Sequence, residues 1–353
     1  MELQVLNASV QGFPIPEQTQ NQISAAFWGY TSGDLKERPS AAHYFDAYYS
    51  PRCQHFTREG GRHISARTHS DVTHIASWIL QDDSRETIRS RLLNQATERG
   101  NAVDEKAIET SIDMCASLLA MIECGKQEFV FSGRSPMLWD SGGLRSCLAR
   151  RFAPQTSLDA SSLKLVKAFT GRNLSRVGGI RIKWTNNLVD HLLLTDDDQA
   201  VSIFQCASFL MIQKQSPNSI FGIDFIDETI RTLALLFPQN DRNTKPWLHS
   251  QLDSGGAPLD TALTKCGSLR AEERRFECFS FWRDRLVILK EAYDESRPKT
   301  LLQWWFDRRN GEQWFTFWIA VLVFAVAITF GLIQSIEGAL QVYLSYKALQ
   351  SAG

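Results

Sequence analysis

The chain has 353 residues, of which 43% are hydrophobic and 22% charged, a composition typical of a globular protein with one large or two modest domains. Its 38 Lys and Arg against 39 Asp and Glu give a net charge of −1, and charges of both signs are interspersed along the sequence. A nucleic-acid-binding protein is therefore not expected, because such a protein carries a basic face or tail.

The N-terminal residues do not indicate secretion, and in a cytosolic setting the cysteines are not expected to form disulfides. Residues 1–22 lack the positive and then apolar regions of a secretory signal. The seven cysteines form no CxxC pair, and we expect them to be reduced and mostly buried. They are Cys53, Cys115, Cys124, Cys147, Cys206, Cys266 and Cys278.

Residues 1–56 contain glycines, prolines and aromatic residues without a sustained period. We expect an irregular N-terminal arm whose aromatic side chains pack onto the next domain or stay loose. Near its end a cysteine and four histidines lie within 22 residues, but their spacing matches no usual zinc finger. We expect surface or capping histidines there, with no metal and no cofactor. The five residues are Cys53, His55, His63, His69 and His74.

Residues 57–297 are expected to form a helix-dominated α+β domain with a small sheet. Three capped helices begin it, with Ser70, Ser84 and Asp104 as N-caps and Gly125 as the end of the third. The third helix has apolar residues at alternating spacings of four and three, which predicts one buried face: Ile108, Ile112, Cys115, Leu119 and Ile122.

After residue 125, short apolar runs between glycine-containing turns predict the sheet. The expected strands are 129–131, 137–139, 180–184 and 201–204, and the expected helices are 143–152, 161–169, 185–194 and 206–212. A helix at 227–238, a long loop at 238–268 and a helix at 269–295 follow. The last helix carries an apolar seam that favours packing against the core over a coiled coil: Phe279, Trp282, Leu286, Leu289 and Tyr293.

Residues 313–336 contain no Asp, Glu, Lys or Arg and predict a transmembrane helix. As a helix they would span about 36 Å, enough to cross a hydrocarbon core of about 30 Å. We expect 298–312 to be an interfacial aromatic segment and 337–353 to be a short C-terminal tail. The residues expected at the membrane interface are Trp304, Trp305, Arg308, Arg309, Trp314 and Trp318.

The place of this helix and its flanking charges predict how it inserts. A span so near the C-terminus is expected to insert after translation, as in tail-anchored proteins. Four Lys and Arg precede it at 297–309 and only Lys347 follows it, so the positive-inside rule keeps the bulk of the chain in the cytosol. Small residues at every fourth position would allow close pairing with another helix: Ala327, Gly331, Ser335 and Ala339.

Two groups of titratable residues could carry chemistry. Asp190 and His191 are adjacent, but no nucleophile motif lies near them. Asp196, Asp197 and Asp198 could bind a divalent cation, yet neighbouring carboxylates of a strand point to opposite faces, so we expect a solvated turn. Phosphate-loop, nucleophile-elbow, zinc-protease and dinucleotide-binding motifs are missing, so the catalytic residues stay unknown.

Several runs of the later half resemble one family: GIRIKWTNNLVDHLLL, VSIFQCASFL, ETIRTLALLFPQ and residues 280–324. The chain resembles a set of uncharacterised proteins of filamentous ascomycete fungi that share a C-terminal span. GRHISARTHSDV and LWDSGGLRSCL are weaker markers of the same family. The resemblance covers most of residues 57–345 and implies a single transmembrane helix, but no activity, cofactor or catalytic residue. Members often carry His near Gln205, so an essential imidazole is not expected at that point.

These features favour a membrane-anchored interaction or adaptor protein, because a folded head, an anchor and no visible catalytic motif are typical of that class. A membrane-bound enzyme with a site built from distant residues is one alternative. An oligomeric membrane effector or pore is another. The expected partners are the lipid bilayer, an unknown cytosolic protein, and a second copy or another transmembrane helix.

Overall fold

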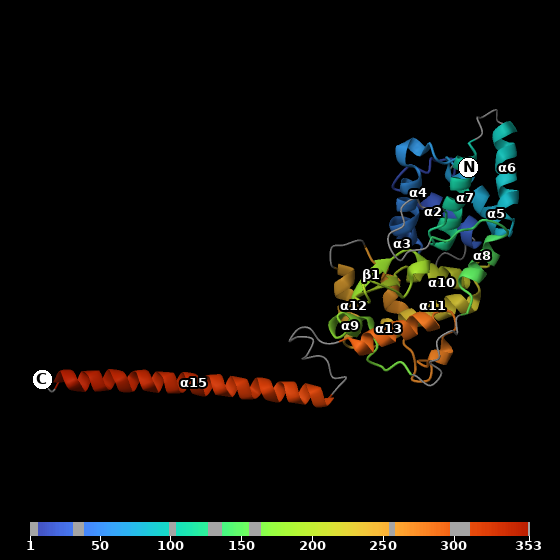
Figure 1. Cartoon of the computed structure of the whole chain (residues 1–353). Coiled ribbons are helices and arrows are strands. Elements are labelled where there is room, and N and C mark those ends of the chain that lie inside the picture. The colour runs from blue at the N-terminus through green and yellow to red at the C-terminus, as the bar shows by residue number, and fades with distance from the viewer. Residues whose placement is uncertain are drawn as a thin grey trace. The chain divides into compact units, whose positions relative to one another are not determined.

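The computed structural model describes residues 6–30, 39–98, 104–125, 136–154, 164–253, 258–296 and 311–351. The chain divides into a globular unit, Met1–Ser175 with Ile180–Ser296, and a second unit, Arg176–Gly179 with Arg297–Gly353. The globular unit is dominated by helices and has one small sheet, and the second unit contains the long helix α15 (Figure 1). The predicted fold class is therefore confirmed.

The helices of the first half gather on one side of the globular unit, above the sheet in Figure 1. They are α2 (Glu17–Trp28), α3 (Ala42–Tyr44), η1 (Phe45–Tyr49), α4 (Ser50–Phe56), η2 (Arg58–Gly61), α5 (His69–Leu80), α6 (Arg85–Glu98) and α7 (Glu105–Ala120). The first four of these show that the irregular arm expected at 1–56 is wrong for residues 17–28 and 42–56.

Distant hydrogen bonds hold this N-terminal segment in the helical layer. The Tyr44 hydroxyl donates to the carbonyl of Leu118 at 2.7 Å, and the Tyr48 hydroxyl donates to the carbonyl of Ser117 at 2.9 Å. Both tyrosine rings are buried. The segment is therefore ordered by partners on α7 that lie about 70 residues away in the sequence.

The helix caps agree with the sequence in two of three cases. Ser84 and Asp104 cap α6 and α7 as predicted, and each accepts a backbone N–H of the first turn at 3.2 Å. The cap predicted at Ser70 is wrong. Thr68 caps α5 instead, because Thr68 and Asp71 each accept the other's backbone N–H in a capping box.

The predicted end of α7 at Gly125 is also wrong. This helix ends at Ala120, where Met121 adopts a positive φ of 50°. The buried face of α7 is as predicted at four positions, all less than 3% exposed: Ile108, Ile112, Cys115 and Leu119. The fifth predicted residue, Ile122, is buried but lies after the end of the helix.

The sheet consists of β1 (Arg181–Thr185), β2 (Leu193–Thr195) and β3 (Ala200–Phe204). Strand β3 is central, parallel to β1 and antiparallel to β2. The strands predicted at 180–184 and 201–204 are confirmed. Every residue of β3 is buried, so the sheet forms part of the core.

Two other predictions for this region are wrong. The helix expected at 185–194 is replaced by the turn η3 (Leu188–Asp190) and strand β2. The backbone of β2 pairs with strand β3 instead of forming the local hydrogen bonds of a helix. The strand expected at 137–139 is reduced to one isolated bridge from Met137 to Cys124. The strand expected at 129–131 lies outside the described residues.

The remaining helices lie at the level of the sheet or below it in Figure 1. They are α8 (Leu144–Arg151), α9 (Gly171–Arg176), α10 (Ala207–Gln215), α11 (Ile223–Leu236), α12 (Thr244–Asp253), η4 (Thr261–Lys265), η5 (Phe276–Cys278) and α13 (Arg283–Glu295). Helices α8 and α10 confirm the predictions at 143–152 and 206–212.

Three helix predictions in this part are wrong in extent. Residues 164–169 of the helix expected at 161–169 are not helical, and 161–163 lie outside the described residues. Helix α11 begins at Ile223 rather than at Asp227, following Gly222 in extended conformation. The loop expected at 238–268 contains α12 and η4.

Only the second half of the helix expected at 269–295 is present, as α13. The cause is Glu228, whose carboxylate accepts the backbone N–H groups of Ser280, Phe281 and Trp282 at 2.7–2.8 Å. These N–H groups are therefore not available to a helix. The predicted apolar seam is nevertheless buried at all five positions: Phe279, Trp282, Leu286, Leu289 and Tyr293.

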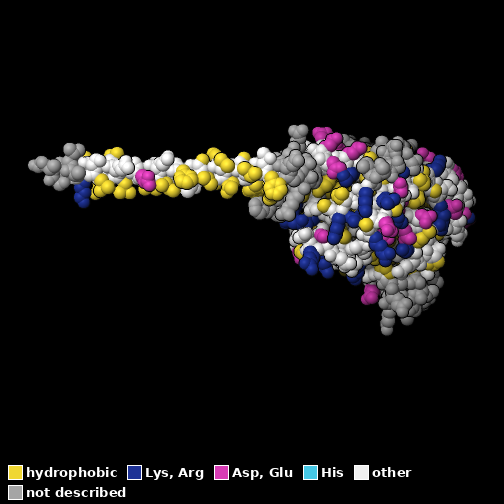
Figure 2. Space-filling view, turned by 90° about the horizontal axis from the view of Figure 1, so that it is seen from below, with side chains coloured by type: hydrophobic (Ala, Val, Ile, Leu, Met, Phe, Trp, Pro, Cys, Tyr) yellow, Lys and Arg dark blue, Asp and Glu magenta, His cyan; other side chains and the backbone are white. Residues whose placement is uncertain are grey.

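Helix α15 (Gly311–Ser351) contains a candidate membrane span, Trp314–Lys347, with a mean hydropathy of 2.5. None of its apolar window is buried against protein. Figure 2 shows hydrophobic side chains along this helix, whereas Lys, Arg, Asp and Glu are interspersed over the globular unit. The span predicted at 313–336 is confirmed as such a candidate, and the helix continues through the predicted tail to Ser351.

Candidate functional site

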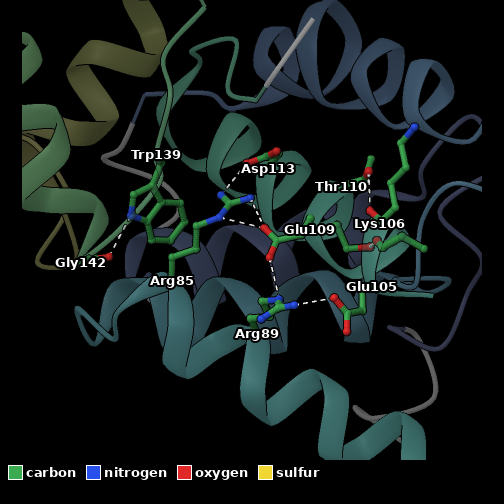
Figure 3. Close-up of polar contacts among 11 residues, drawn as sticks. Arg85, Arg89, Glu105, Lys106, Glu109, Thr110, Asp113, Trp139 and Gly142 are labelled. Carbon is green, nitrogen blue, oxygen red and sulfur yellow. Dashed lines mark hydrogen bonds and ion pairs between the residues drawn. The ribbon is translucent and has the colours of Figure 1, made fainter. Parts of the chain in front are cut away.

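The candidate site is built from two neighbouring helices with opposite charges. Helix α6 presents Arg85 and Arg89, and helix α7 presents Glu105, Glu109 and Asp113 (Figure 3). Residues four apart lie on the same face of a helix, so each set forms a stripe along its helix. Arg85 pairs with Asp113, whereas Arg89, one turn later on α6, pairs with Glu105, which comes earlier on α7. The pairs therefore run in opposite order along the two helices, and α6 and α7 are antiparallel.

Arg85 is the centre of the cluster and is only 9% exposed. Its Nη1 donates to Asp113 Oδ1 at 2.6 Å, and its Nε donates to Glu109 Oε2 at 2.9 Å. Its guanidinium carbon lies 5.4 Å from the centre of the Trp139 ring, so the cation also packs on an aromatic face. Two carboxylates of α7 and one aromatic ring therefore fix this side chain.

Trp139 forms the apolar wall behind Arg85. The ring is 2% exposed, and its Nε1 donates to the carbonyl of Gly142 at 2.9 Å. The same carbonyl accepts the backbone N–H of Arg85 at 3.0 Å. The 139–142 turn is thus tied both to the Arg85 backbone and to its side chain.

Burial shifts the protonation equilibria of the two buried partners. Desolvation raises the pKa of Asp113, and the hydrogen bonds and charge of Arg85 only partly oppose that rise. Desolvation alone would lower the pKa of Arg85, but its bonds to Asp113 and Glu109 outweigh this effect and raise the pKa. Arg85 therefore stays charged, and most of its charge is already neutralised within the cluster.

A cavity of about 400 Å³ opens beside this cluster. Four carboxylates line it, and two of them, Glu86 and Asp140, are exposed. The cations that line it are Arg85, which is paired within the cluster, and Lys106, which points away from Arg85 in Figure 3. Leu138, 48% exposed, also lines the cavity. An acidic pocket with an apolar residue in its wall suits a positively charged side chain.

Gly125 limits the other side of this pocket. Its φ is +102°, and a Cβ there would lie 2.6 Å from Asp113 Oδ2. A side chain at this position would therefore push against a carboxylate that already binds Arg85. Although Gly125 does not end α7 as predicted, it gives room to the site.

The two residues considered for acid–base chemistry lie elsewhere and are closed to solvent. Asp190 is 2% exposed and His191 is 0% exposed. Arg285 donates from Nη1 to the carbonyls of Val189 and His191 at 2.7 and 2.5 Å, which fixes the turn that carries them. Burial lowers the pKa of His191 to about 3, so its imidazole is neutral.

Asp196, Asp197 and Asp198 form the turn that the sequence predicts. All three have positive φ angles between 51° and 62°, and Asp196 pairs with Arg181 and Lys183. The hydrogen bond from Lys183 is the main reason why the pKa of Asp196 is lowered.

The cysteine and histidines at 53–74 are not brought together. Cys53 is buried. The expectation of a surface or capping side chain is wrong for His69, which is 1% exposed and shares a hydrogen bond of 2.9 Å with the Tyr49 hydroxyl. Within the described residues, no group of three or more His, Cys, Asp or Glu side chains is placed to hold a metal ion.

The predicted membrane residues fall into two sets. Trp314 and Trp318 lie in the first turns of α15 with their ring centres 6.2 Å apart, and Trp304, Trp305, Arg308 and Arg309 lie outside the described residues. The small residues at four-residue spacing lie in the middle and later part of α15, where a Cβ on Gly331 would meet nothing within 4 Å. They are Ala327, Gly331, Ser335 and Ala339.

The acidic pocket was not predicted from the sequence, although a signal was present. Arg85 and Arg89 are four residues apart in one predicted helix, and Glu105, Glu109 and Asp113 are four apart in the next. Opposite charge stripes on consecutive helices predict an ion-paired interface. Trp139 carries no such signal, because its contact with Arg85 depends on the tertiary fold.

No protein-family model, curated protein or solved structure matches this chain. The proposals below therefore depend on the geometry of the molecule itself.

Proposed function

We propose that this chain is a membrane-anchored interaction protein. In this proposal α15 holds the chain in a lipid bilayer, and the globular unit binds a basic segment of a partner protein in the acidic pocket beside Arg85. The observation that carries the proposal is the pocket of about 400 Å³ with exposed carboxylates at Glu86 and Asp140. Its own buried cation pairs with Glu109 and Asp113, so it does not occupy the exposed carboxylates.

The chemistry of the pocket favours a Lys or Arg side chain as the bound group. A carboxylate accepts hydrogen bonds only, and an ammonium or guanidinium group donates several. The exposed Leu138 offers an apolar surface to the methylene stem of such a side chain. Charge complementarity of this kind contributes to the specificity and the rate of association.

We further propose that the globular unit faces the cytosol. Four Lys and Arg lie between residues 297 and 309, against Lys347 after the apolar stretch. The positive-inside rule places the more basic flank in the cytosol. A cytosolic protein with a basic segment is then the partner.

The test compares full-length proteins captured from detergent-solubilised membranes. One variant carries Glu86→Lys and Asp140→Lys, and the matched control carries Asp224→Lys, an exposed carboxylate in the first turn of α11. A partner held by the pocket is expected at near-stoichiometric amount with the native chain and the control. It is expected to be lost from the double variant. The loss is expected to be largest at low salt, where interactions between charges are least screened.

Two outcomes would contradict the proposal. Equal recovery of the partner with the double variant would place the binding surface elsewhere. Recovery of only the chain itself, and only when α15 is present, would favour self-association through the small-residue positions of α15, as in the effector or pore alternative.

A further inference from the structure

A second cavity, of about 260 Å³, lies beside the C-terminal end of α11 and the residues that follow it. It shares no lining residue with the acidic pocket. Ala234, Leu235 and Leu269 contribute apolar surface to it, and Lys167 and Arg274 contribute positive charge. This cavity therefore combines an apolar floor with two cations.

Arg274 is the unusual member of this cavity. Its Nε and Nη1 atoms are buried and have no hydrogen-bond partner among the described residues. Its backbone is fixed, because its carbonyl accepts the N–H of Leu165 at 2.8 Å. A guanidinium group is always charged, and buried N–H groups without acceptors are unfavourable. Arg274 lines the cavity, so the positive charge of this side chain is offered to an anion bound there.

Other donors face the same space. Lys167 is exposed at the cavity. Ser268 Oγ accepts the backbone N–H of Asn240 at 3.3 Å, which leaves its hydroxyl hydrogen free to donate. A planar guanidinium, an ammonium and a hydroxyl together are typical of a site for a phosphate oxygen.

The single carboxylate of the cavity, Asp241, is already engaged as a helix cap. Its Oδ2 accepts the N–H groups of Asn243 at 3.2 Å and Thr244 at 2.7 Å, at the start of α12. A carboxylate here can also accept a hydroxyl hydrogen of a bound molecule. A neighbouring cavity of about 300 Å³ shares Lys167 and Asp241 and adds Arg172, so cations outnumber carboxylates three to one over both cavities.

We propose that this pair of cavities binds a phosphate ester that carries free hydroxyl groups. The phosphate lies between Arg274 and Lys167, and the hydroxyl-bearing part extends towards Asp241 over the apolar floor. A soluble sugar phosphate and the head group of a phosphorylated polyol lipid share this chemistry. The proposal does not depend on the acidic pocket or on a protein partner.

The test uses the full-length protein in micelles of an uncharged detergent. Binding of glucose 6-phosphate, of inorganic phosphate and of phosphatidylinositol 4-phosphate mixed into the micelles is measured by titration calorimetry. We expect saturable binding of one of the two esters, tighter than that of inorganic phosphate. Arg274→Gln and Lys167→Gln are each expected to weaken it at least tenfold, and Arg270→Gln, an exposed arginine of the same segment, is expected to leave it unchanged.

The two ester arms distinguish a soluble ligand from a lipid head group, and either result supports the proposal. Absence of saturable ester binding, or binding that is equal in all three variants, would overturn it. Lys167 is exposed, so its variant keeps the test valid even if Arg274→Gln disturbs folding. Without ligand, we expect the Arg274→Gln protein to melt at an unchanged or higher temperature, because it loses N–H groups that have no partner.

Discussion

The Nε2 atom of His191 lies 2.7 Å from the hydroxyl oxygen of Thr232. The other ring nitrogen, Nδ1, accepts the backbone N–H of Phe204 at 3.2 Å, so Nε2 carries the proton and donates it to Thr232. Thr232 in turn donates to the carbonyl of Thr229 at 2.6 Å. Both ring nitrogens of His191 are therefore used to join β3 to α11, and neither is left for a substrate.

This arrangement predicts that two histidines stay neutral far into the acid range. Burial lowers the pKa of His191 to about 3 and that of His69 to about 4, below the ordinary 6.5. A lowered folded-state pKa means that the unfolded chain binds the proton first as pH falls below 6.5. The stabilisation is complete above pH 6.5 and is lost as pH falls to about 4 for His69 and to about 3 for His191, by at most about 1.4 kcal/mol per pH unit for each histidine.

The measurement is a pH titration of the imidazole signals by NMR in protein with labelled histidines. The signals of His191 and His69 are expected to stay at the neutral-ring position from pH 8 to pH 5. His249, which is exposed, provides the solvent-accessible reference. A midpoint near pH 6.5 for His191 would show that the ring is open to water and would return the enzyme alternative to consideration.

Removing Arg85 is expected to destabilise the globular unit strongly. The variant Arg85→Met leaves Asp113 without its cation and leaves Glu109 paired only with Arg89, and breaking a buried ion pair typically costs about 3–5 kcal/mol. We expect a loss near the lower end, because the Glu109 side chain is 35% exposed. Chemical unfolding of the full-length protein in detergent measures the free energy of unfolding.

Arg91→Met is the matched control for this prediction. Arg91 lies on the same helix and pairs with Asp83, but its side chain is 42% exposed, so the expected loss is at most about 1 kcal/mol. Adding Asp113→Asn to Arg85→Met is expected to restore part of the lost stability. Equal losses in the free energy of unfolding for Arg85→Met and Arg91→Met would show that the buried cluster stabilises the fold no more than an exposed ion pair does.

Glu228→Gln is expected to loosen the segment before α13. A glutamine keeps one acceptor oxygen for the N–H groups of Phe281 and Trp282. Its NH2 group then faces the N–H of Ser280, so that two hydrogen-bond donors are placed against each other. A buried donor without an acceptor costs about 1–3 kcal/mol. Hydrogen exchange is expected to accelerate at Ser280 first. Glu291→Gln, at an exposed position of α13, should change stability by less than about 0.5 kcal/mol.

The fold was predictable wherever local interactions decide it. The caps of α6 and α7 and the buried face of α7 depend on residues within one or two turns of one another. The helix expected from 269 failed for the opposite reason, since Glu228, about 50 residues earlier, binds the N–H groups that a helix would need. Strand β2 was missed in the same way, because its pairing with β3 forms only in the tertiary structure.

The candidate site was less predictable than the fold. The charge stripes of α6 and α7 can be read from residue spacing, but Trp139 and Gly142 join them only through the tertiary structure. Conversely, Asp190 and His191 attract attention in the sequence because they are titratable neighbours. Their burial, which excludes them from contact with solvent, cannot be read from that pair alone.

Charges placed in the middle of α15 are expected to prevent membrane insertion. Twelve Val, Ile, Leu or Phe residues between 315 and 333 favour insertion by about 4–7 kcal/mol in total. An arginine at the centre of a span costs about 2.5–3.5 kcal/mol, so Val323→Arg with Ala325→Arg offsets most or all of that gain. The measured quantity is the fraction of protein that stays in the membrane pellet after alkaline extraction.

The control for this prediction places the same two arginines, with the same spacing, at the beginning of the helix. Trp314→Arg with Thr316→Arg adds charge at the expected interface, where the cost is small and the positive-inside rule is respected. This protein is expected to remain in the pellet, whereas the Val323 and Ala325 double variant is expected in the supernatant. If both double variants remain in the pellet equally, α15 does not hold the chain in the bilayer, and the globular unit must bind the membrane by another surface.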